Sequence, residues 1–202
     1  MDISTVKAWL GTGSINIFGM PFSGKDTQAR ALAENLGAAV IAGGDILRSH
    51  PDQETIKKLM LTGELFPTDY YLDIITPFLS QPKLAQRPLV LSSVGRWHGE
   101  EETIMKAANQ SGHSLKAVIS LELDEDEIWR RFETSGKQKD RGFRYDDAGQ
   151  ILRTRLNEFQ SKTHPVIDFY RNNGLLLDID ALGTPEEVTN RILDRLEKFS
   201  HA

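Results

Sequence analysis

The chain of 202 residues contains no cysteine. Without thiols it can form no disulfide, no thiolate nucleophile and no cysteine-based zinc site. It also has no run of 18 apolar residues, and its opening segment, MDISTVKAWL, lacks the basic start and long apolar core of a secretion signal. We therefore expect no membrane-spanning segment and a cytoplasmic location.

An excess of positive charge is missing as well. The 24 Lys and Arg residues are outnumbered by 29 Asp and Glu residues, which gives a net charge of −5. This balance offers no whole-chain electrostatic attraction to nucleic acid. Hydrophobic content of 39% and charged content of 26% are ordinary for one globular domain. We expect a single domain over residues 1–202, and a monomer, with no readable role for residues 1–13.

The sequence does contain one glycine-rich motif, GMPFSGKDT, at residues 19–27. It follows the apolar run 15–18 and precedes a run of helix formers, which is the context of a phosphate-binding P-loop. Gly19 and Gly24 let the backbone curl so that its N–H groups face inward. The start of the helix adds partial positive charge, and Lys25 would reach the β- and γ-phosphates of a nucleoside triphosphate.

Apolar runs and helical patterns alternate along the chain. The predicted buried strands are residues 15–18, 38–41, 88–92, 117–123 and 175–179. Most are continuous apolar runs, which is typical of a parallel sheet covered on both faces. Amphipathic helices are predicted at 147–160 and 185–199, and His164-Pro165 should break or kink the chain before 166–170. The alternation predicts a three-layer α/β fold.

Arginines follow several of the predicted strands. Arg48 comes after the second strand, Arg96 after the third and Arg131 after the fourth. Ligands of open α/β sheets bind beyond the carboxyl ends of the strands, so these side chains are expected to meet at one anionic site. The planar guanidinium binds phosphate oxygens in pairs and keeps its charge, which favours a phosphate ligand.

Several segments in order along the chain together resemble the adenylate kinase family of nucleoside monophosphate kinases. GMPFSGKDTQA resembles that family's G-x-P-G-S-G-K-G-T-Q-A, and GGDILR resembles T-G-D-M-L-R. TGELFP, VLSSVGR, RYDD, RTRL and THPVIDFY stand where the family has G-x-L-V-P/T, L-D-G-F-P-R, R-x-D-D, R-L and T-x-P-L-I-x-Y-Y. The resemblance covers nearly the whole chain, from about residue 15 to residue 199.

The resemblance implies a set of site residues. The ATP-binding positions would be Gly19, Pro21, Ser23, Gly24, Lys25, Asp26, Thr27 and Arg131. The positions that bind the nucleoside monophosphate would be Gly43, Asp45, Arg48, Gly95, Arg96, Glu100, Arg144 and Arg155. Catalysis would rest on Lys25, Arg96, Arg131, Arg144 and Arg155, with the arginines oriented by Asp146. Mg²⁺ would be held, mainly through water, by Asp45 and Asp26.

The fold implied by the resemblance is a P-loop three-layer α/β/α sandwich with a central five-stranded parallel sheet. A helical insertion that binds the monophosphate would lie at about 43–79, and a short lid without zinc at about 133–143. The activity implied is transfer of the γ-phosphoryl group of ATP to a nucleoside monophosphate, with Mg²⁺. Such a reaction needs alignment and charge neutralisation more than covalent help. The alternative is a non-catalytic nucleotide-binding relative.

Two departures from the family pattern concern the metal. Asp26 stands in place of the glycine after the P-loop lysine, and Ser92 stands in place of an aspartate at the end of the third strand. One interpretation is that the carboxylate lost at Ser92 is regained at Asp26, which keeps the charge near Mg²⁺ constant. The alternative is that Asp26 repels the triphosphate and impairs catalysis.

Two further departures concern the base of the acceptor. Gly43 stands where the family usually has a base-contacting threonine, and Glu100 where it usually has glutamine. A carboxylate only accepts hydrogen bonds, so it suits N–H donors of a base. We expect AMP as the acceptor, with GMP and pyrimidine nucleotides as the alternatives.

Overall fold

The computed structural model describes residues 2–138 and 149–201. Its strands are β1(Ser14–Gly19), β2(Ala39–Ala42), β3(Leu89–Ser92), β4(Leu115–Glu122) and β5(Leu176–Asp180). They form one parallel sheet in the order β2-β3-β1-β4-β5. Each strand lies within two residues of a predicted one, so the predicted five-stranded parallel sheet is confirmed.

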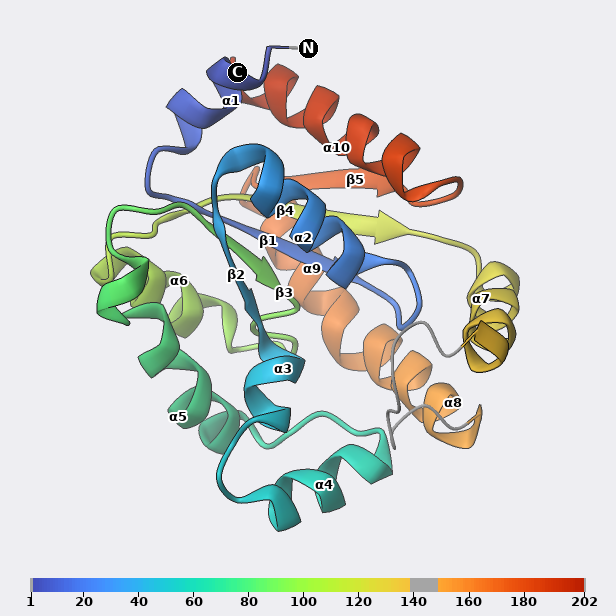
Figure 1. The fold of residues 1–202 in the computed structure, drawn as a ribbon. Helices are drawn as coiled ribbons and strands as arrows, with labels where there is room; N and C mark the ends of the chain where they lie inside the picture. The colour runs from blue at the N-terminus through green and yellow to red at the C-terminus, as the bar shows by residue number, and fades with distance from the viewer. Residues whose placement is uncertain (1, 139–148, 202) are drawn as a thin grey trace.

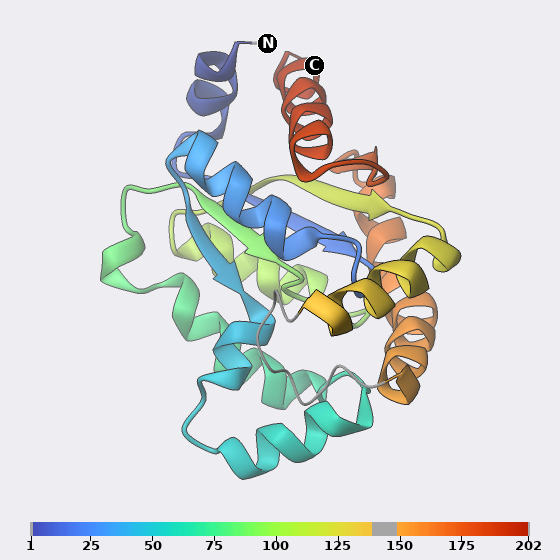
Figure 2. The same cartoon turned by 45° about the vertical axis from the view of Figure 1, so that its right-hand side comes forward.

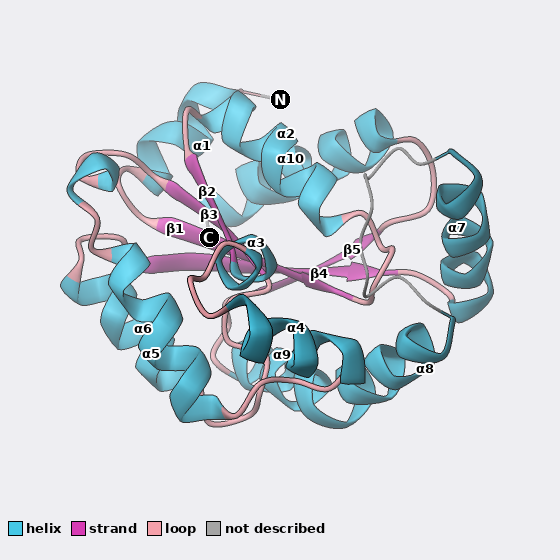
Figure 3. Cartoon of the chain, turned by 60° about the horizontal axis from the view of Figure 1, so that its bottom comes forward, coloured by secondary structure: helices cyan, strands magenta, loops and turns pink. Residues whose placement is uncertain are grey.

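Helices cover both faces of the sheet (Figure 3). One face carries α1(Ile3–Leu10), α2(Lys25–Leu36) and α10(Pro185–Ser200), and the other carries α6(Glu101–Gln110) and α9(His164–Asn172). The apolar residues of β1 and β4 are buried between the layers because their side chains alternate toward both faces. The predicted stripe of α10 lies in this core, with Val188, Ile192 and Leu196 buried. The three-layer arrangement is therefore as predicted.

A helical segment leaves the sheet between β2 and β3. It consists of α3(Gly43–Arg48), α4(Gln53–Thr62), α5(Thr68–Leu79) and the short 3-10 helix η1(Pro82–Leu84). It extends below the sheet in Figure 1, with buried Ile56, Phe66 and Ile75 in a core that it shares with β3 and α6. The N–H of Leu65 donates to Glu158 Oε2 at 2.9 Å, so the segment is tied to the long helix on the opposite side.

A second excursion separates β4 from β5. It begins with α7(Glu125–Gln138) and resumes with α8(Gly149–Glu158), the π-helix η2(Phe159–Thr163) and α9, which run on without a gap (Figures 1 and 2). Of the predicted break or kink before Val166, the break does not occur, and the irregularity at this place is the π-helix. Pro165 falls in the first turn of α9, where its missing N–H costs little, and the wider turn of the π-helix precedes it.

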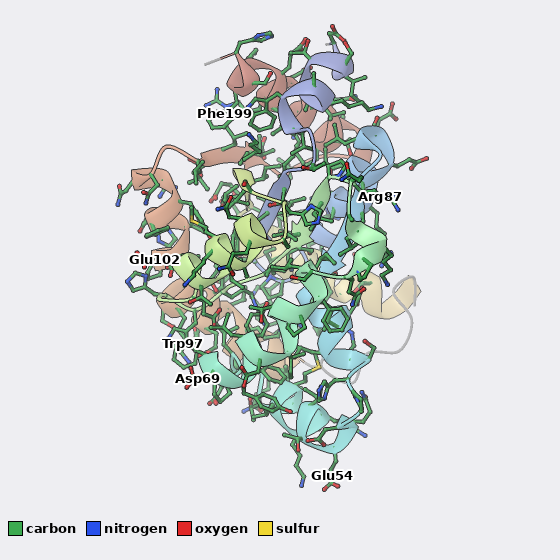
Figure 4. All side chains as sticks on the ribbon, turned by 90° about the vertical axis from the view of Figure 1, so that its left-hand side faces the viewer. Glu54, Asp69, Arg87, Trp97, Glu102 and Phe199 are labelled. Carbon is green, nitrogen blue, oxygen red and sulfur yellow. The ribbon has the colours of Figure 1, made fainter. Side chains whose placement is uncertain are left out.

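Residues 3–10 form a helix that the sequence did not predict. Helix α1 packs on α10, with Val6 and Leu10 fully buried and the Trp9 ring 6.0 Å from that of Phe199 at 88°. Phe199 marks this end of the molecule in Figure 4. No helix in the described residues is long and apolar enough to cross a bilayer.

Candidate active site

The loop between β1 and α2 has a tight backbone that favours glycine at two positions. Gly24 precedes α2 with φ of 94°, in the left-handed region that side chains disfavour. A Cβ added to Gly19 would lie 2.4 Å from Ser23 Oγ, which is too close for any other residue. The chain therefore folds tightly over the end of β1 and enters α2 at Lys25.

Two features of this loop suit the binding of an anion, namely the Ser23 hydroxyl and the start of α2. Ser23 Oγ is buried, and no described residue offers it a hydrogen bond. No side chain caps α2, so the N–H groups of its first turn have no side-chain partner at the Gly24 cap. A helix N-terminus without a side-chain cap and with a positive dipole is suited to phosphate. The loop thus fits the triphosphate that the motif predicts.

Phe22 is a residue of this loop that the sequence reasoning missed. Its φ is 64°, and a left-handed conformation costs a residue with a side chain roughly 1–2 kcal/mol. Its ring packs edge-to-face on Phe132 of α7, with centroids 5.4 Å apart, and Phe132 in turn contacts Trp129. The available signal was that Phe22 stands where the pattern G-x-P-G-S-G-K has glycine. Packing on α7 offsets the strained backbone.

The loop and α7 enclose a cavity of about 340 Å³, which we call the donor cavity. Of the predicted ATP-binding residues it is lined by Ser23, Gly24, Lys25, Asp26, Thr27 and Arg131. Arg131 reaches across the loop, because its guanidinium donates to the Ser23 carbonyl at 3.3 Å and the Ala181 carbonyl at 2.9 Å. Glu127 accepts from Arg130 and from Arg131 Nε, and these bonds lower the pKa of the Glu127 carboxyl to about 2. Glu127 therefore holds Arg131 over the loop.

A second cavity, of about 80 Å³, lies between β3 and the helical segment α3–α5, and we call it the acceptor cavity. Its lining includes four cationic side chains, which are Lys25, Arg48, Arg96 and Arg155. Lys25 and Asp26 line both cavities, so the two meet at the start of α2. At this junction Asp26 Oδ1 accepts a hydrogen bond from Ser92 Oγ at 2.8 Å. Clustered cations on one side of a shared junction favour an anionic ligand in each cavity.

The loop that carries Arg96 is held by side chains from several elements. Asn16 in β1 bonds both the carbonyl and the N–H of Val94, at 2.7 and 3.4 Å. Thr163 Oγ1 donates to the Arg96 carbonyl at 3.0 Å. The Tyr71 hydroxyl bonds the Ser93 carbonyl and the Gly95 N–H. Because these groups fix the backbone on both sides of Arg96, its guanidinium is carried on a rigid base.

Comparison with known proteins agrees with this arrangement. The family model described as adenylate kinase matches residues 17–175. The chain belongs to the adenylate kinase family. An adenylate kinase of Thermus thermophilus is 33% identical over 189 residues, which cover 91% of this chain and 97% of the relative. The adenylate kinases of Streptomyces avermitilis and Phocaeicola vulgatus are 33% and 29% identical, over 91% and 92% of this chain and 97% and 99% of their own.

Glu100, predicted to contact the acceptor base in this adenylate kinase family member, is also a brace of the Arg96 loop. It is almost fully buried, and its Oε2 accepts from the N–H groups of Arg96 and Trp97 at 2.8 and 3.1 Å. Burial raises the pKa of the Glu100 carboxyl, and bonds from Trp97 and Thr68 oppose that rise. Glu100 does not line the acceptor cavity itself but a small cavity beside it, together with Tyr71 and Arg96.

The other predicted residues of this family member are placed as follows. Gly43, Asp45 and Arg48 line the acceptor cavity, and Asp45 accepts from Arg48 at 2.7 Å. Gly19 and Pro21 line neither the donor cavity nor the acceptor cavity but a small third cavity, which Arg96 and Arg155 also line. Gly95 lines neither the donor nor the acceptor cavity, but its N–H donates a hydrogen bond to the hydroxyl of Tyr71, which lines the acceptor cavity. Residues 133–138 of the predicted lid are the end of α7, whereas Arg144, Asp146 and residues 139–143 lie outside the described residues.

The two carboxylates predicted to hold the Mg²⁺ expected for the adenylate kinase family, Asp26 and Asp45, both line the acceptor cavity. Asp26 lies where the donor and acceptor cavities meet, and the Ser92 hydroxyl holds its oxygen in place. No cluster of three or more His, Asp or Glu side chains that could hold a metal occurs in the described residues. The donor set therefore suits an ion that keeps most of its waters, as Mg²⁺ does, more than one enclosed by protein ligands.

Proposed function

We propose that the chain is an ATP-dependent nucleoside monophosphate kinase that transfers the γ-phosphoryl group of ATP to AMP. The observation that carries this proposal is the junction of the two cavities at Lys25. One cavity begins at the P-loop and the other is lined by arginines, so a triphosphate in the first and a monophosphate in the second would point their phosphates at each other. The printed names of the relatives, adenylate kinase, support the same activity.

The residues of the junction suit this transfer without a general base, because the acceptor phosphate is already an anionic nucleophile. The P-loop amides, Ser23 Oγ and Lys25 would hold the β- and γ-phosphates. Arg48 and Arg96 would bind the acceptor phosphate, while Arg131, Arg155 and Arg144 would neutralise the group in transfer. Such preorganised charges contribute most when the site excludes water. Asp26 and Asp45 would hold Mg²⁺ by accepting hydrogen bonds from its waters, and the ion would supply charge neutralisation for the phosphates.

We further propose that the segment from Gly43 to Leu79 forms the acceptor-binding insertion and that residues 133–143 close over ATP. The short tie from Leu65 to Glu158 supports the first part, because it places the insertion against the helix that carries Arg155. Glycine and basic residues in the second segment are typical of a closing flap. We propose a monomer that acts in the cytoplasm, where its substrates are made.

The test is ADP release from ATP, measured by a coupled assay against a panel of ribo- and deoxynucleoside monophosphates. We expect turnover with AMP above all others, and dependence on Mg²⁺. Isothermal calorimetry with ADP and AMP separates the alternative, a non-catalytic relative. Binding of both nucleotides without turnover of any acceptor would favour that alternative over the kinase.

A further inference from the structure

Gly43 and Tyr71 share one space on the wall of the acceptor cavity. Gly43 begins α3 and Tyr71 lies in the first turn of α5, and both line this cavity. A Cβ added to Gly43 would come 2.9 Å from Tyr71 Oη and 3.2 Å from the Ser93 carbonyl oxygen, but 3.8 Å from the ring carbon that bears the Tyr71 hydroxyl. The hydroxyl therefore occupies the room that a side chain at position 43 would need.

The Tyr71 hydroxyl retains capacity for a ligand. A phenol has one donor and two acceptor sites. It donates to the Ser93 carbonyl at 3.4 Å and accepts from the Gly95 N–H at 3.3 Å, both long for hydrogen bonds. One acceptor site is left over. Burial raises the pKa of Tyr71 to about 12, so the group stays a neutral hydroxyl at physiological pH.

The neighbouring polar group is also an acceptor. The Glu100 carboxylate lines the same small cavity as Tyr71, and a carboxylate accepts without donating. We propose that Tyr71 Oη and Glu100 form an acceptor-only wall where the acceptor cavity meets the small cavity beside it, which selects a nucleobase with an exocyclic amine at the ring position where adenine carries one. This inference rests on the proposed kinase function and adds Tyr71 as its specificity-determining residue.

The chemistry predicts which bases the wall accepts. An amine of adenine or cytosine donates to Tyr71 or Glu100, whereas a carbonyl at the same ring position places an acceptor against acceptors. AMP and IMP form the sharpest pair, because they share the purine, ribose and phosphate and differ at that position. Ribose 5-phosphate keeps the sugar and phosphate but has no base, so it reports on the arginines alone.

The experiment measures dissociation constants of AMP, IMP and ribose 5-phosphate by calorimetry, without ATP. We expect wild type to bind AMP about tenfold more tightly than IMP, and Tyr71→Phe to lose about that factor for AMP alone. The matched control is Tyr70→Phe on the same helix, whose buried hydroxyl has no hydrogen-bond partner among the described residues. It should keep the preference. Gly43→Ser added to Tyr71→Phe should restore part of it, since the new hydroxyl enters the vacated space.

Two results would overturn the inference. Equal weakening of AMP and ribose 5-phosphate by Tyr71→Phe would make Tyr71 only a brace of the Arg96 loop. An unchanged AMP constant would remove the residue from recognition. If Tyr71→Phe does not fold, Gly43→Ala in the wild-type background displaces the Tyr71 hydroxyl without supplying another, and the AMP preference must again fall. If wild type binds no AMP, the proposed function is overturned too. If wild type turns over AMP but Tyr71→Phe leaves the dissociation constants unchanged, this inference alone is overturned.

Discussion

Ser92 Oγ donates a hydrogen bond to Asp26 Oδ1 across 2.8 Å, from the last residue of β3 to the first turn of α2. The two positions are the ones at which the sequence departs from the metal-binding pattern of the adenylate kinase family. Their contact places the Asp26 carboxylate beside the position at which the family pattern has an aspartate. The structure thus brings the two exchanges together, while their effect on Mg²⁺ stays a prediction.

Exchange of the pair should change the use of Mg²⁺. Asp26→Gly is expected to weaken Mg²⁺ activation, because loss of an anionic partner for the metal's waters typically costs about 10–100-fold. Adding Ser92→Asp should recover at least about tenfold in kcat at limiting Mg²⁺. The measurement is a Mg²⁺ titration of both variants, with Mn²⁺ binding followed by electron paramagnetic resonance as a readout independent of turnover.

The opposing hypothesis, that Asp26 repels ATP, makes the reverse prediction for the single variant. Asp26→Gly would then be faster than wild type and would show a lower KM for ATP. Ser92→Ala is the control, because it removes the hydroxyl and leaves the carboxylate. A faster Asp26→Gly enzyme would end the idea of compensation.

Loss of the P-loop lysine should abolish turnover and spare the fold. Lys25 lies where the donor and acceptor cavities meet, so Lys25→Ala removes charge that stabilises the transition state. Removing one such group costs roughly 10²–10³-fold in kcat. The ADP-release assay and thermal unfolding measure the two quantities, and Lys7→Ala on the distant helix α1 is the control. A Lys25→Ala variant with near-wild-type kcat would take the loop out of the mechanism.

Arg96 and Arg144 should separate binding from catalysis. Arg96 lines the acceptor cavity, so Arg96→Ala is expected mainly to raise KM for the monophosphate. Arg144→Ala is expected mainly to lower kcat, because its partner charge would develop during transfer. Initial-rate kinetics with both substrates varied check this. Variants that differ from wild type only in KM for ATP would contradict both assignments.

The ion pairs of Glu127 should make α7 sensitive to acid. The folded pKa of Glu127 is lowered from 4.5 to about 2 by bonds from Arg130 and Arg131. Its contribution to stability is therefore complete above the unfolded pKa near 4.5 and is lost as the pH falls through about 2. The Tm gap between wild type and Glu127→Gln should be constant near neutral pH and close below pH 4.5.

The control for this acid effect is Glu133→Gln, which changes an exposed carboxylate on the same helix. The difference in Tm between wild type and Glu133→Gln should be small at every pH. Differential scanning calorimetry from pH 7 down to about pH 2 records both gaps. If the difference in Tm between wild type and Glu127→Gln persists at about pH 2, Arg130 and Arg131 do not stabilise the charge of Glu127.

The sheet and the phosphate loop were predictable from the sequence because local patterns determine them. The run around Ile15 and Ile17 is continuous and apolar, and the glycine spacing allows one kind of turn. The braces of the Arg96 loop were not predictable in the same way. Asn16 was visible only as a lone polar residue inside an apolar strand, and the partners of Tyr71 and Thr163 are distant in sequence.

Pattern also failed where packing overrides propensity. Pro165 indicated a break, yet the helix continues because a π-helical turn absorbs the missing donor. Helix α1 has too few residues to be stable alone and depends on α10, a contact between opposite ends of the chain. The roles of Arg144 and Asp146 come from motif likeness alone and stay predictions.

The packing of Phe22 on Phe132, and of Phe132 on Trp129, gives the protein an optical reporter of its phosphate loop. The chain has three tryptophans, and each lies in a different setting. Trp129 packs on Phe132, which in turn contacts the phosphate loop on the donor side. Trp97 follows Arg96 in the chain, and the Lys162 ammonium lies 4.0 Å from its ring centre. Trp9 packs against Phe199. Trp97 and Phe199 are far apart in Figure 4. In variants that keep one tryptophan each, the fluorescence of Trp129 should therefore change on ATP binding and that of Trp97 on acceptor binding. The variant that keeps only Trp9 should show no change and is the reference. Stopped-flow fluorescence could then time the two binding events without a dye.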